Sequence, residues 1–192
     1  MTPITVKGYT NIEVDRRELL RYAGVRGDSP ESSALAESVI AEASPLITLR
    51  LAYREIKISE LPLVGLDHPA ILDRLAGCSS VILLAATSGI ALDRLILRAG
   101  TTSPARALML DALGAERVEA VIDRFTSDLL ASDRAVGVLP RFSPGYGRIP
   151  LEIQKIIFSL LDCPRTVGIT LGDSLLMSPA KSVTAFIGIK ER

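Results

Sequence analysis

The stretch at residues 139–150 contains the side chains best suited to binding a ligand. It is too rich in proline and glycine for regular structure, so we predict an ordered loop with tight turns. Pro144-Gly145 suits a type II turn, because glycine accepts the positive φ that this turn requires, and the turn would hold Arg141 and Tyr146 in a fixed relation. A helix expected to begin at Pro150 would add free backbone amides, and a guanidinium beside them would suit a carboxylate or a phosphate. The same composition is also typical of a plain connection.

Few other residues could carry out chemistry. His68 is the sole histidine, and the proline that follows it indicates a helix start capped by Asp67 or His68. Cys78 and Cys163 lie far apart in the sequence, so histidine and cysteine cannot readily supply three ligands to a zinc ion. We therefore predict no metal site and no catalytic residue, with a catalytic role for His68 as the alternative to capping. We interpret Cys78 as a small buried hydrophobic residue.

The composition narrows the class of protein. The chain has 192 residues, and its 22 Lys+Arg balance 22 Asp+Glu, so no basic footprint for nucleic acid is present. The absence of tryptophan and an aromatic content of 4% also argue against base stacking. The longest apolar run, at 81–86, is too short for a membrane span or a signal peptide. We expect a single cytoplasmic domain over residues 1–192 that binds neither nucleic acid nor membrane.

Helix signals occur along most of the chain. Asp15 followed by Glu18 predicts a capped helix that stops at Gly24. Ser103-Pro104 predicts the start of a long helical region, which Gly114 either divides or opens to close packing. Apolar residues at helical spacing predict that one face of its second half lies on the core. Further helices are expected at 33–42, 69–76, 90–98 and from 150 to just before 163.

Strand signals gather in the middle and at the end of the sequence. Residues 49–58 alternate between apolar and polar with one phase slip near Glu55, which predicts a half-exposed strand that could contain a bulge there. Residues 78–86 are apolar on both faces, as expected for a central strand. Shorter strands are predicted at 166–171, 174–177 and 182–189. Helices early and strands late favour an α+β domain with a twisted, mostly antiparallel sheet flanked by helices.

Three segments resemble one known family in the same order. Arg141-Phe142-Ser143-Pro144-Gly145-Tyr146 is similar to the Arg-x-x-Pro-Gly-Tyr motif of the activation domain of cobalamin-dependent methionine synthase. Residues 77–89, with Asp93 beyond them, and residues 171–183 resemble two further segments of that domain. The resemblance spans about residues 77–188, and residues 1–60 match only loosely. Gly147-Arg148-Ile149-Pro150 departs from the family's continuation, and the family's early Asp-Trp-Thr-Pro segment has no counterpart.

The resemblance implies a fold and a function. The fold would be an antiparallel sheet with flanking helices. The domain would bind S-adenosylmethionine and offer its methyl group to cobalamin held by a partner, which is methionine synthase or another corrinoid protein. A flavodoxin-like donor would supply the electron that reduces the cobalamin. Arg141 would pair with the carboxylate of S-adenosylmethionine, the backbone around Ser143 would hydrogen-bond the ligand, and Tyr146 would stand near the methyl donor, with Pro144 and Gly145 shaping the turn between them.

Three hypotheses about function follow from these observations. The leading hypothesis is a stand-alone reactivation subunit that supports reductive methylation of a partner's cobalamin. The alternative is a non-catalytic module of the same fold that docks on a corrinoid protein. A third hypothesis is an unrelated protein that binds a small carboxylate with the same loop.

Overall fold

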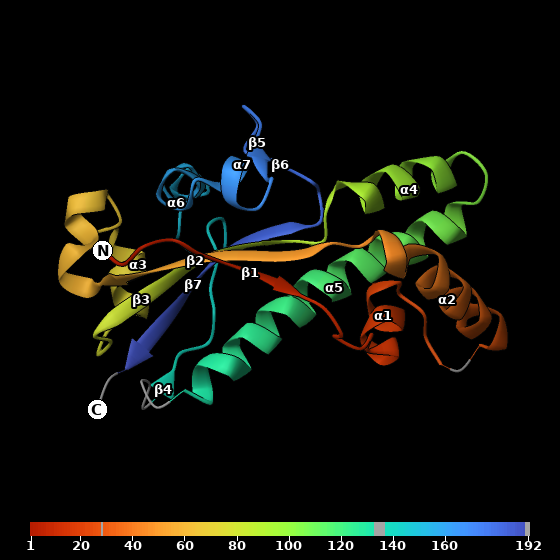
Figure 1. The fold of residues 1–192 in the computed structure, drawn as a ribbon, viewed down its shortest axis with the longest axis horizontal. Helices are drawn as coiled ribbons and strands as arrows, with labels where there is room; N and C mark the ends of the chain where they lie inside the picture. The colour runs from red at the N-terminus through yellow and green to blue at the C-terminus, as the bar shows by residue number, and fades with distance from the viewer. Residues whose placement is uncertain (28, 133–136, 191–192) are drawn as a thin grey trace.

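The fold is that of a computed structural model, which describes residues 1–27, 29–132 and 137–190. It confirms the predicted α+β class, with a five-stranded sheet in the order β1-β2-β3-β7-β4, in which all neighbouring strands are antiparallel, and helices on both of its faces (Figure 1). The strands are β1 (Thr5–Tyr9), β2 (Leu49–Lys57), β3 (Ser80–Thr87), β4 (Gly137–Val138), β5 (Thr170–Leu171), β6 (Met177–Ser178) and β7 (Ser182–Lys190). The helices are α1 (Arg16–Tyr22), α2 (Pro30–Ala43), α3 (Pro69–Arg74), α4 (Ile90–Gly100), α5 (Pro104–Leu130), α6 (Ile153–Leu161) and α7 (Cys163–Thr166), with 3-10 turns η1 (Ser44–Leu46) and η2 (Ile58–Val64).

The centre of the sheet follows the sequence prediction closely. β3 is buried along its whole length between β2 and β7, as its two apolar faces predicted. The predicted bulge in β2 is wrong, because the pairing with β3 is continuous from Arg50 opposite Thr87 to Lys57 opposite Ser80. The phase slip has another cause: Leu51 and Tyr53, before Glu55, pack on the face covered by α5, whereas Ile56, after it, packs on the opposite face. Helices cover both faces, so both sets of apolar side chains are accommodated. β1, at the sheet edge, was not predicted from its short and mostly polar sequence.

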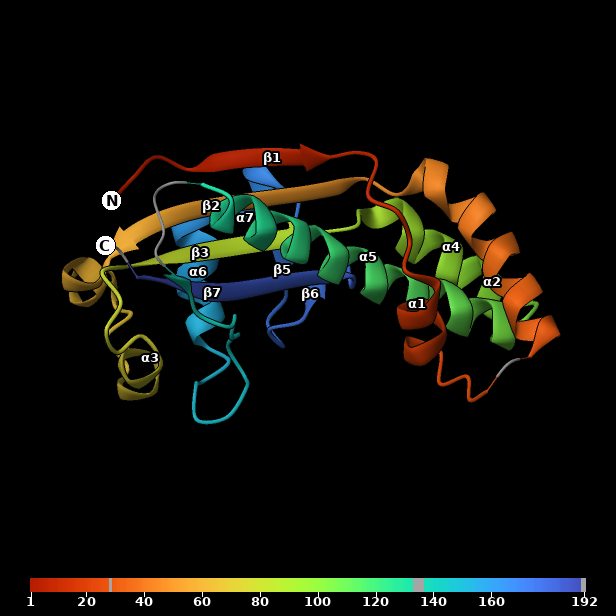
Figure 2. The same cartoon turned by 90° about the horizontal axis from the view of Figure 1, so that it is seen from below.

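The long helix α5 covers one face of the sheet (Figure 2). Its second half packs Val121, Ile122 and Phe125 against strand residues of β2, β3 and β7, which confirms the predicted apolar face. Ser103 caps its start by accepting a hydrogen bond from the backbone of Arg106. Gly114 does not divide the helix: a Cβ there would lie 2.7 Å from Leu92 Cδ2, so the glycine lets α4 pack closely.

Helices α3, α6 and α7 lie on the opposite face with the second part of the core. α6 begins at Ile153 rather than at Pro150, because residues 150–152 form a turn first. The expected strand at 166–171 is mostly wrong: the turn at Asp162 leads into α7, and only Thr170 and Leu171 pair, with β6. The strand expected at 174–177 is likewise shortened and shifted to Met177–Ser178, after the turn that begins at Gly172.

Helices α1, α2, α4 and the first half of α5 form a separate helical region beyond the end of the sheet (Figure 1). Asp15 caps α1 as predicted, whereas α2 begins earlier than predicted, at Pro30, because Ser29 caps it. The buried Arg117 donates to the carbonyls of Ile12 and Glu13, and it also pairs with Glu116. This pair therefore fixes α1 on α5. No helix of the described residues has the length and apolarity needed to cross a membrane.

Candidate functional site

A cavity of about 720 Å³ lies where the predicted loop meets the edge of β7. It brings together four of the five residues singled out from the sequence, Arg141, Ser143, Pro144 and Tyr146, and Gly145 shapes their turn without lining the cavity. The other walls come from α3, α5, the start of α6, β7 and the segment around β5 and β6. They are formed by Arg74, Glu119, Phe142, Leu151, Gln154, Leu175, Leu176, Met177, Ala180, Ser182, Val183 and Thr184. Its volume lies in the range of about 300–1,000 Å³ that is usual for small-molecule sites.

Phe142 anchors the loop to the sheet. Its backbone N–H donates to the carbonyl of Phe186 at 3.1 Å, and the N–H of Phe186 donates back at 2.8 Å. The two rings stack with their centroids 5.0 Å apart and an angle of 14° between their planes. Because Phe142 is buried and held by both backbone and ring, the positions of Arg141 and Ser143 on either side of it are set by β7.

The turn that follows has the conformation expected from Pro144-Gly145. The carbonyl of Ser143 accepts a hydrogen bond from the N–H of Tyr146, and Gly145 has φ of +84°, the sign that the third residue of a type II turn requires. The N–H of Gly145 donates to the carbonyl of Ile149 at 3.0 Å, which closes the loop. Tyr146 emerges from this turn with 71% of its surface exposed, at the mouth of the cavity.

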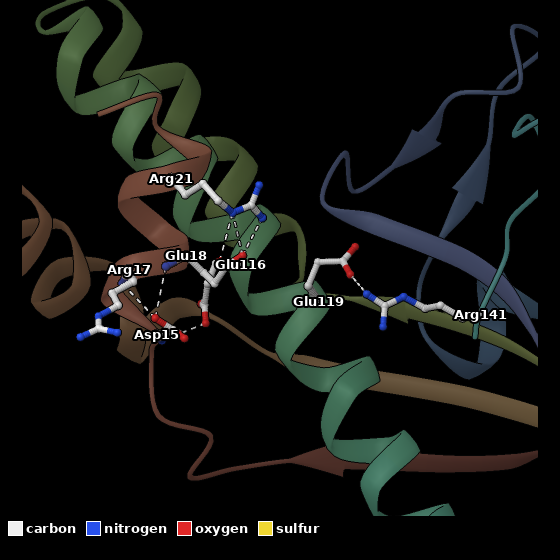
Figure 3. Close-up of polar contacts among 7 residues, drawn as sticks. All are labelled: Asp15, Arg17, Glu18, Arg21, Glu116, Glu119 and Arg141. Atoms are coloured by element: carbon white, nitrogen blue, oxygen red, sulfur yellow. Dashed lines mark hydrogen bonds and ion pairs between the residues drawn. The ribbon is translucent and has the colours of Figure 1, made fainter. Parts of the chain in front are cut away.

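Arg141 points toward α5, where Figure 3 shows its contact with Glu119. Asp123, on the same helix, is its second carboxylate partner. Its guanidinium donates to Asp123 Oδ1 at 2.5 Å through Nη1 and to Glu119 through Nη2. Burial lowers the pKa of Arg141, but the hydrogen bond with Asp123 and the charge of Glu119 outweigh this effect and raise it. The guanidinium therefore stays charged in a half-buried position. Among the described residues, its hydrogen bonds all go to carboxylates of α5.

The acidic residues on the other side of α5 have structural partners (Figure 3). Glu116 accepts from the N–H of Asp15 at 3.0 Å, and Asp15 in turn accepts from the N–H groups of Arg17 and Glu18. Glu18 pairs with Arg21 within α1. These contacts fix the two helices together, whereas Glu119 lies on the side of α5 that reaches Arg141 and the cavity.

Several polar residues of the cavity were missed by the sequence analysis, among them Arg74 on α3. Glu119 lies in an amphipathic helix with many charges, so its sequence alone did not distinguish it. Gln154 is 3% exposed on the apolar face of α6 and donates Nε2 to the carbonyl of Leu175 at 2.9 Å. Thr184 Oγ1 is buried and has no hydrogen-bond partner among the described residues. A polar residue inside an apolar run was the available signal for the latter two.

The other chemical candidates have structural roles. His68 Nδ1 accepts from the N–H of Ala70 at 3.2 Å, so the predicted cap of α3 is confirmed with His68 as the capping residue. Burial raises the pKa of Cys163 to about 12, and Asp162 adds to this effect, so the thiol is unreactive at neutral pH. Within residues 1–27, 29–132 and 137–190, no cluster of histidine, cysteine and carboxylates could hold a metal ion.

Comparison with known proteins supports the resemblance seen in the sequence. Residues 122–192 match the family model described as "Vitamin B12 dependent methionine synthase, activation domain". The predicted resemblance to this domain is confirmed. The fold agrees over more of the chain: the crystal structure of the MetH reactivation domain bound to AdoHcy aligns with 98% of this chain and 79% of its own, with a TM-score of 0.66 and 14% identity. A search of curated proteins finds no match.

The match to the activation domain includes both sides of the cavity. Residues 122–192 contain the loop with Arg141 and Tyr146, the helix α6 and the strand β7. Glu119 and Arg74 lie before the matched segment and reach the cavity through the fold alone. The likeness to the solved reactivation domain at 14% identity establishes the fold, and the roles of individual residues follow from the geometry.

Proposed function

We propose that this chain binds S-adenosylmethionine in the cavity beside β7 and presents the methyl group to cobalamin carried by a corrinoid methyltransferase such as methionine synthase. The observation that carries this proposal is the convergence of the family-like loop on one cavity with a charged rim, formed by Arg141 and Glu119. The similar reactivation domain, crystallised with AdoHcy, supports the ligand class.

The charged rim suits the amino-acid end of the ligand. That end carries a carboxylate and an ammonium group side by side, and Arg141 and Glu119 offer the two opposite charges in contact with each other. A guanidinium binds a carboxylate through two parallel N–H groups, which fixes orientation as well as affinity. Asp123 holds Arg141 from the solvent side, where its own side chain is 68% exposed, and so it is the partner that the ligand carboxylate would replace.

The mouth of the cavity suits delivery of the methyl group to a partner. Tyr146 and Leu176 are 71% and 72% exposed there, so their side chains are available to a docked protein. The partner's cobalamin would supply a strongly nucleophilic methyl acceptor once a flavodoxin-like donor has reduced it. The sulfonium of S-adenosylmethionine is already a good leaving group, so this chain needs to supply position rather than acid–base catalysis.

A reactivation experiment tests the proposal. The chain is mixed with methionine synthase that lacks its own activation domain and has been inactivated to Co(II), together with S-adenosylmethionine and a chemical or flavodoxin reductant, and the methylcobalamin spectrum is followed. We expect recovery to require the chain and to be lost when Arg141→Ala and Tyr146→Phe are combined. Arg148→Ala is the matched control, because Arg148 is in the same loop, 85% exposed and not part of the cavity lining. Equal recovery without the chain would refute the proposal.

The second candidate is a docking module that binds a corrinoid protein without delivering methyl groups. It rests on the exposed Tyr146 and Leu176, which would contact a docked protein whether or not the cavity holds a ligand. A chain that binds the corrinoid protein but shows no binding of S-adenosylmethionine at millimolar concentration would support this second function over the first.

A further inference from the structure

Thr184 is a buried polar residue that the folded chain itself does not use. The residue is 2% exposed on β7, its Oγ1 has no hydrogen-bond partner among the described residues, and it lines the cavity. Most buried hydroxyl groups are hydrogen-bonded, because leaving one unpaired is costly in a folded protein. The position of Thr184 in the cavity wall therefore points to a group that enters the cavity as its partner.

The backbone N–H and C=O of Thr184 also lack hydrogen-bond partners among the described residues. In β7 the N–H and C=O groups of Phe186 pair with Phe142, and the carbonyl of Gly188 accepts from the N–H of Leu139. The backbone N–H and C=O groups of even-numbered residues therefore face this edge of the sheet. The edge partner ends at Phe142, since the chain turns away at Pro144. The backbone N–H and C=O of Thr184 consequently face the edge with no hydrogen bond in the described part of the chain. One residue thus offers a donor, an acceptor and a hydroxyl.

The cavity has two different ends on the two sides of this edge. Arg141 reaches the face of the sheet covered by α5, whereas Thr184 has the same facing as Phe186, whose ring packs on the face covered by α6. On the face of Phe186 the lining includes apolar side chains and one cation, Arg74, whose guanidinium lies 5.3 Å from the centroid of the Phe142 ring. The apolar residues are Leu151, Leu175 and Met177. Glu119 on α5 is the one carboxylate among the described lining residues, so a charged amino-acid group fits the first end and a flat ring with a polar edge fits the second.

We infer that Thr184 and the open edge of β7 bind the adenine of the ligand, an assignment that rests on the proposed function. Adenine presents an amino donor next to a ring-nitrogen acceptor, which complements the C=O and N–H of one strand residue. The apolar side chains would cover the faces of the ring, and Thr184 Oγ1 would take a further ring nitrogen or a ribose hydroxyl. Thr184 would then determine specificity for the nucleoside, as Arg141 would for the amino acid.

Binding measurements on the whole chain test this assignment. The probes are S-adenosylhomocysteine, 5′-methylthioadenosine, which lacks the amino-acid end, and S-inosylhomocysteine, in which an oxygen replaces the adenine amino group. Thr184→Val keeps the shape and removes the hydroxyl, so it should weaken the first two probes by about 3- to 10-fold, the loss expected for one hydrogen bond. Arg141→Ala should weaken only the probes that carry the amino acid. Wild type should bind the inosyl compound at least about 10-fold more weakly, because two carbonyl oxygens would face each other.

The controls separate a site role from a structural one. Thr126→Val removes a hydroxyl that donates to the carbonyl of Ile122 within α5, outside the cavity, and should leave all three affinities unchanged. Thr184→Val should melt no lower than wild type, because its hydroxyl has no partner to lose. If wild type binds S-adenosylhomocysteine and Thr184→Val binds both adenosyl probes equally well, or if the inosyl compound binds as tightly, the adenine assignment is wrong. If wild type binds none of the probes, the proposed function fails with it.

Discussion

The ion pair between Arg141 and Asp123 predicts opposite changes in ligand affinity when its two members are substituted. In the unliganded chain the guanidinium is held by Glu119 and Asp123. If the ligand carboxylate replaces Asp123, then Asp123 competes with the ligand, and Asp123→Asn should strengthen binding. Arg141→Ala should weaken binding, and Glu119→Gln should weaken it too, because the ammonium group of the ligand loses its counter-charge.

The size of each effect follows from exposure. Asp123 is 68% exposed, so its ion pair is screened by water, and such pairs contribute about 0.2–1 kcal/mol. Removing this competitor should therefore tighten binding by about 1.5- to 5-fold. Hydrogen bonds to a charged group contribute about 1.5–3 kcal/mol, and the pair with Asp123 that the ligand must break in the wild type offsets about 0.2–1 kcal/mol of that. The net loss for Arg141→Ala is therefore about 0.5–2.8 kcal/mol, or roughly 2- to 100-fold.

Isothermal titration with S-adenosylhomocysteine measures these changes directly. Asp128→Asn is the control, because Asp128 pairs with Arg124 on the same helix and does not contact Arg141. The gain in affinity from Asp123→Asn should shrink in 0.5 M salt, because the Debye length falls to about 4 Å and the exposed ion pair is screened. If Asp123→Asn weakened binding as strongly as Arg141→Ala, the intact ion pair would be the binding surface and the competition argument would be refuted.

Three further predictions concern the turn, the helix contact and a buried thiol. Gly145→Val should reduce S-adenosylhomocysteine binding at least about 10-fold without unfolding at room temperature, because its φ of +84° is unfavourable for valine; a global loss of helical circular dichroism would contradict this. Gly114→Ala should cost about 1–3 kcal/mol in urea unfolding, because its Cβ has no room, whereas Gly100→Ala, with nothing within 4 Å, should not destabilise. The raised pKa of Cys163, from 9.0 to about 12, stabilises the protein below pH 9, and this contribution is lost as pH rises from about 9 to 12; Cys163→Ala should show a shallower fall in unfolding free energy over that range.

Sequence patterns predicted the elements that depend on local signals. The apolar run of β3 predicted a central strand, and Ser103-Pro104 with its apolar face predicted α5. These elements are long and strongly patterned, so tertiary contacts reinforce the local preference. The short strands β5 and β6 were misplaced, because two-residue pairs are defined by a turn, here at Gly172, rather than by strand propensity.

The partners of the candidate residues could not be predicted in the same way. The pairing of Arg141 with Glu119 joins an irregular loop to the middle of a helix across the edge of the sheet, and no local pattern encodes that distance. The open edge at Thr184 depends on where the partner segment leaves β7, which Phe142 and Pro144 decide together. Both are properties of packing between segments rather than of any one segment.

The hexapeptide itself shows why these residue types occur at this spacing. Phe142 is the one buried side chain that pairs with β7, so its neighbours Arg141 and Ser143 must point away from the core on that edge. Pro144 and Gly145 then reverse the chain within one turn, so that Tyr146 returns to the same cavity instead of continuing along the strand. A longer connection would separate the arginine from the tyrosine, and a straight one would extend the edge pairing onto Thr184. The motif thus both places the charged rim and ends the pairing, and it is this ending that leaves the inner part of the cavity open.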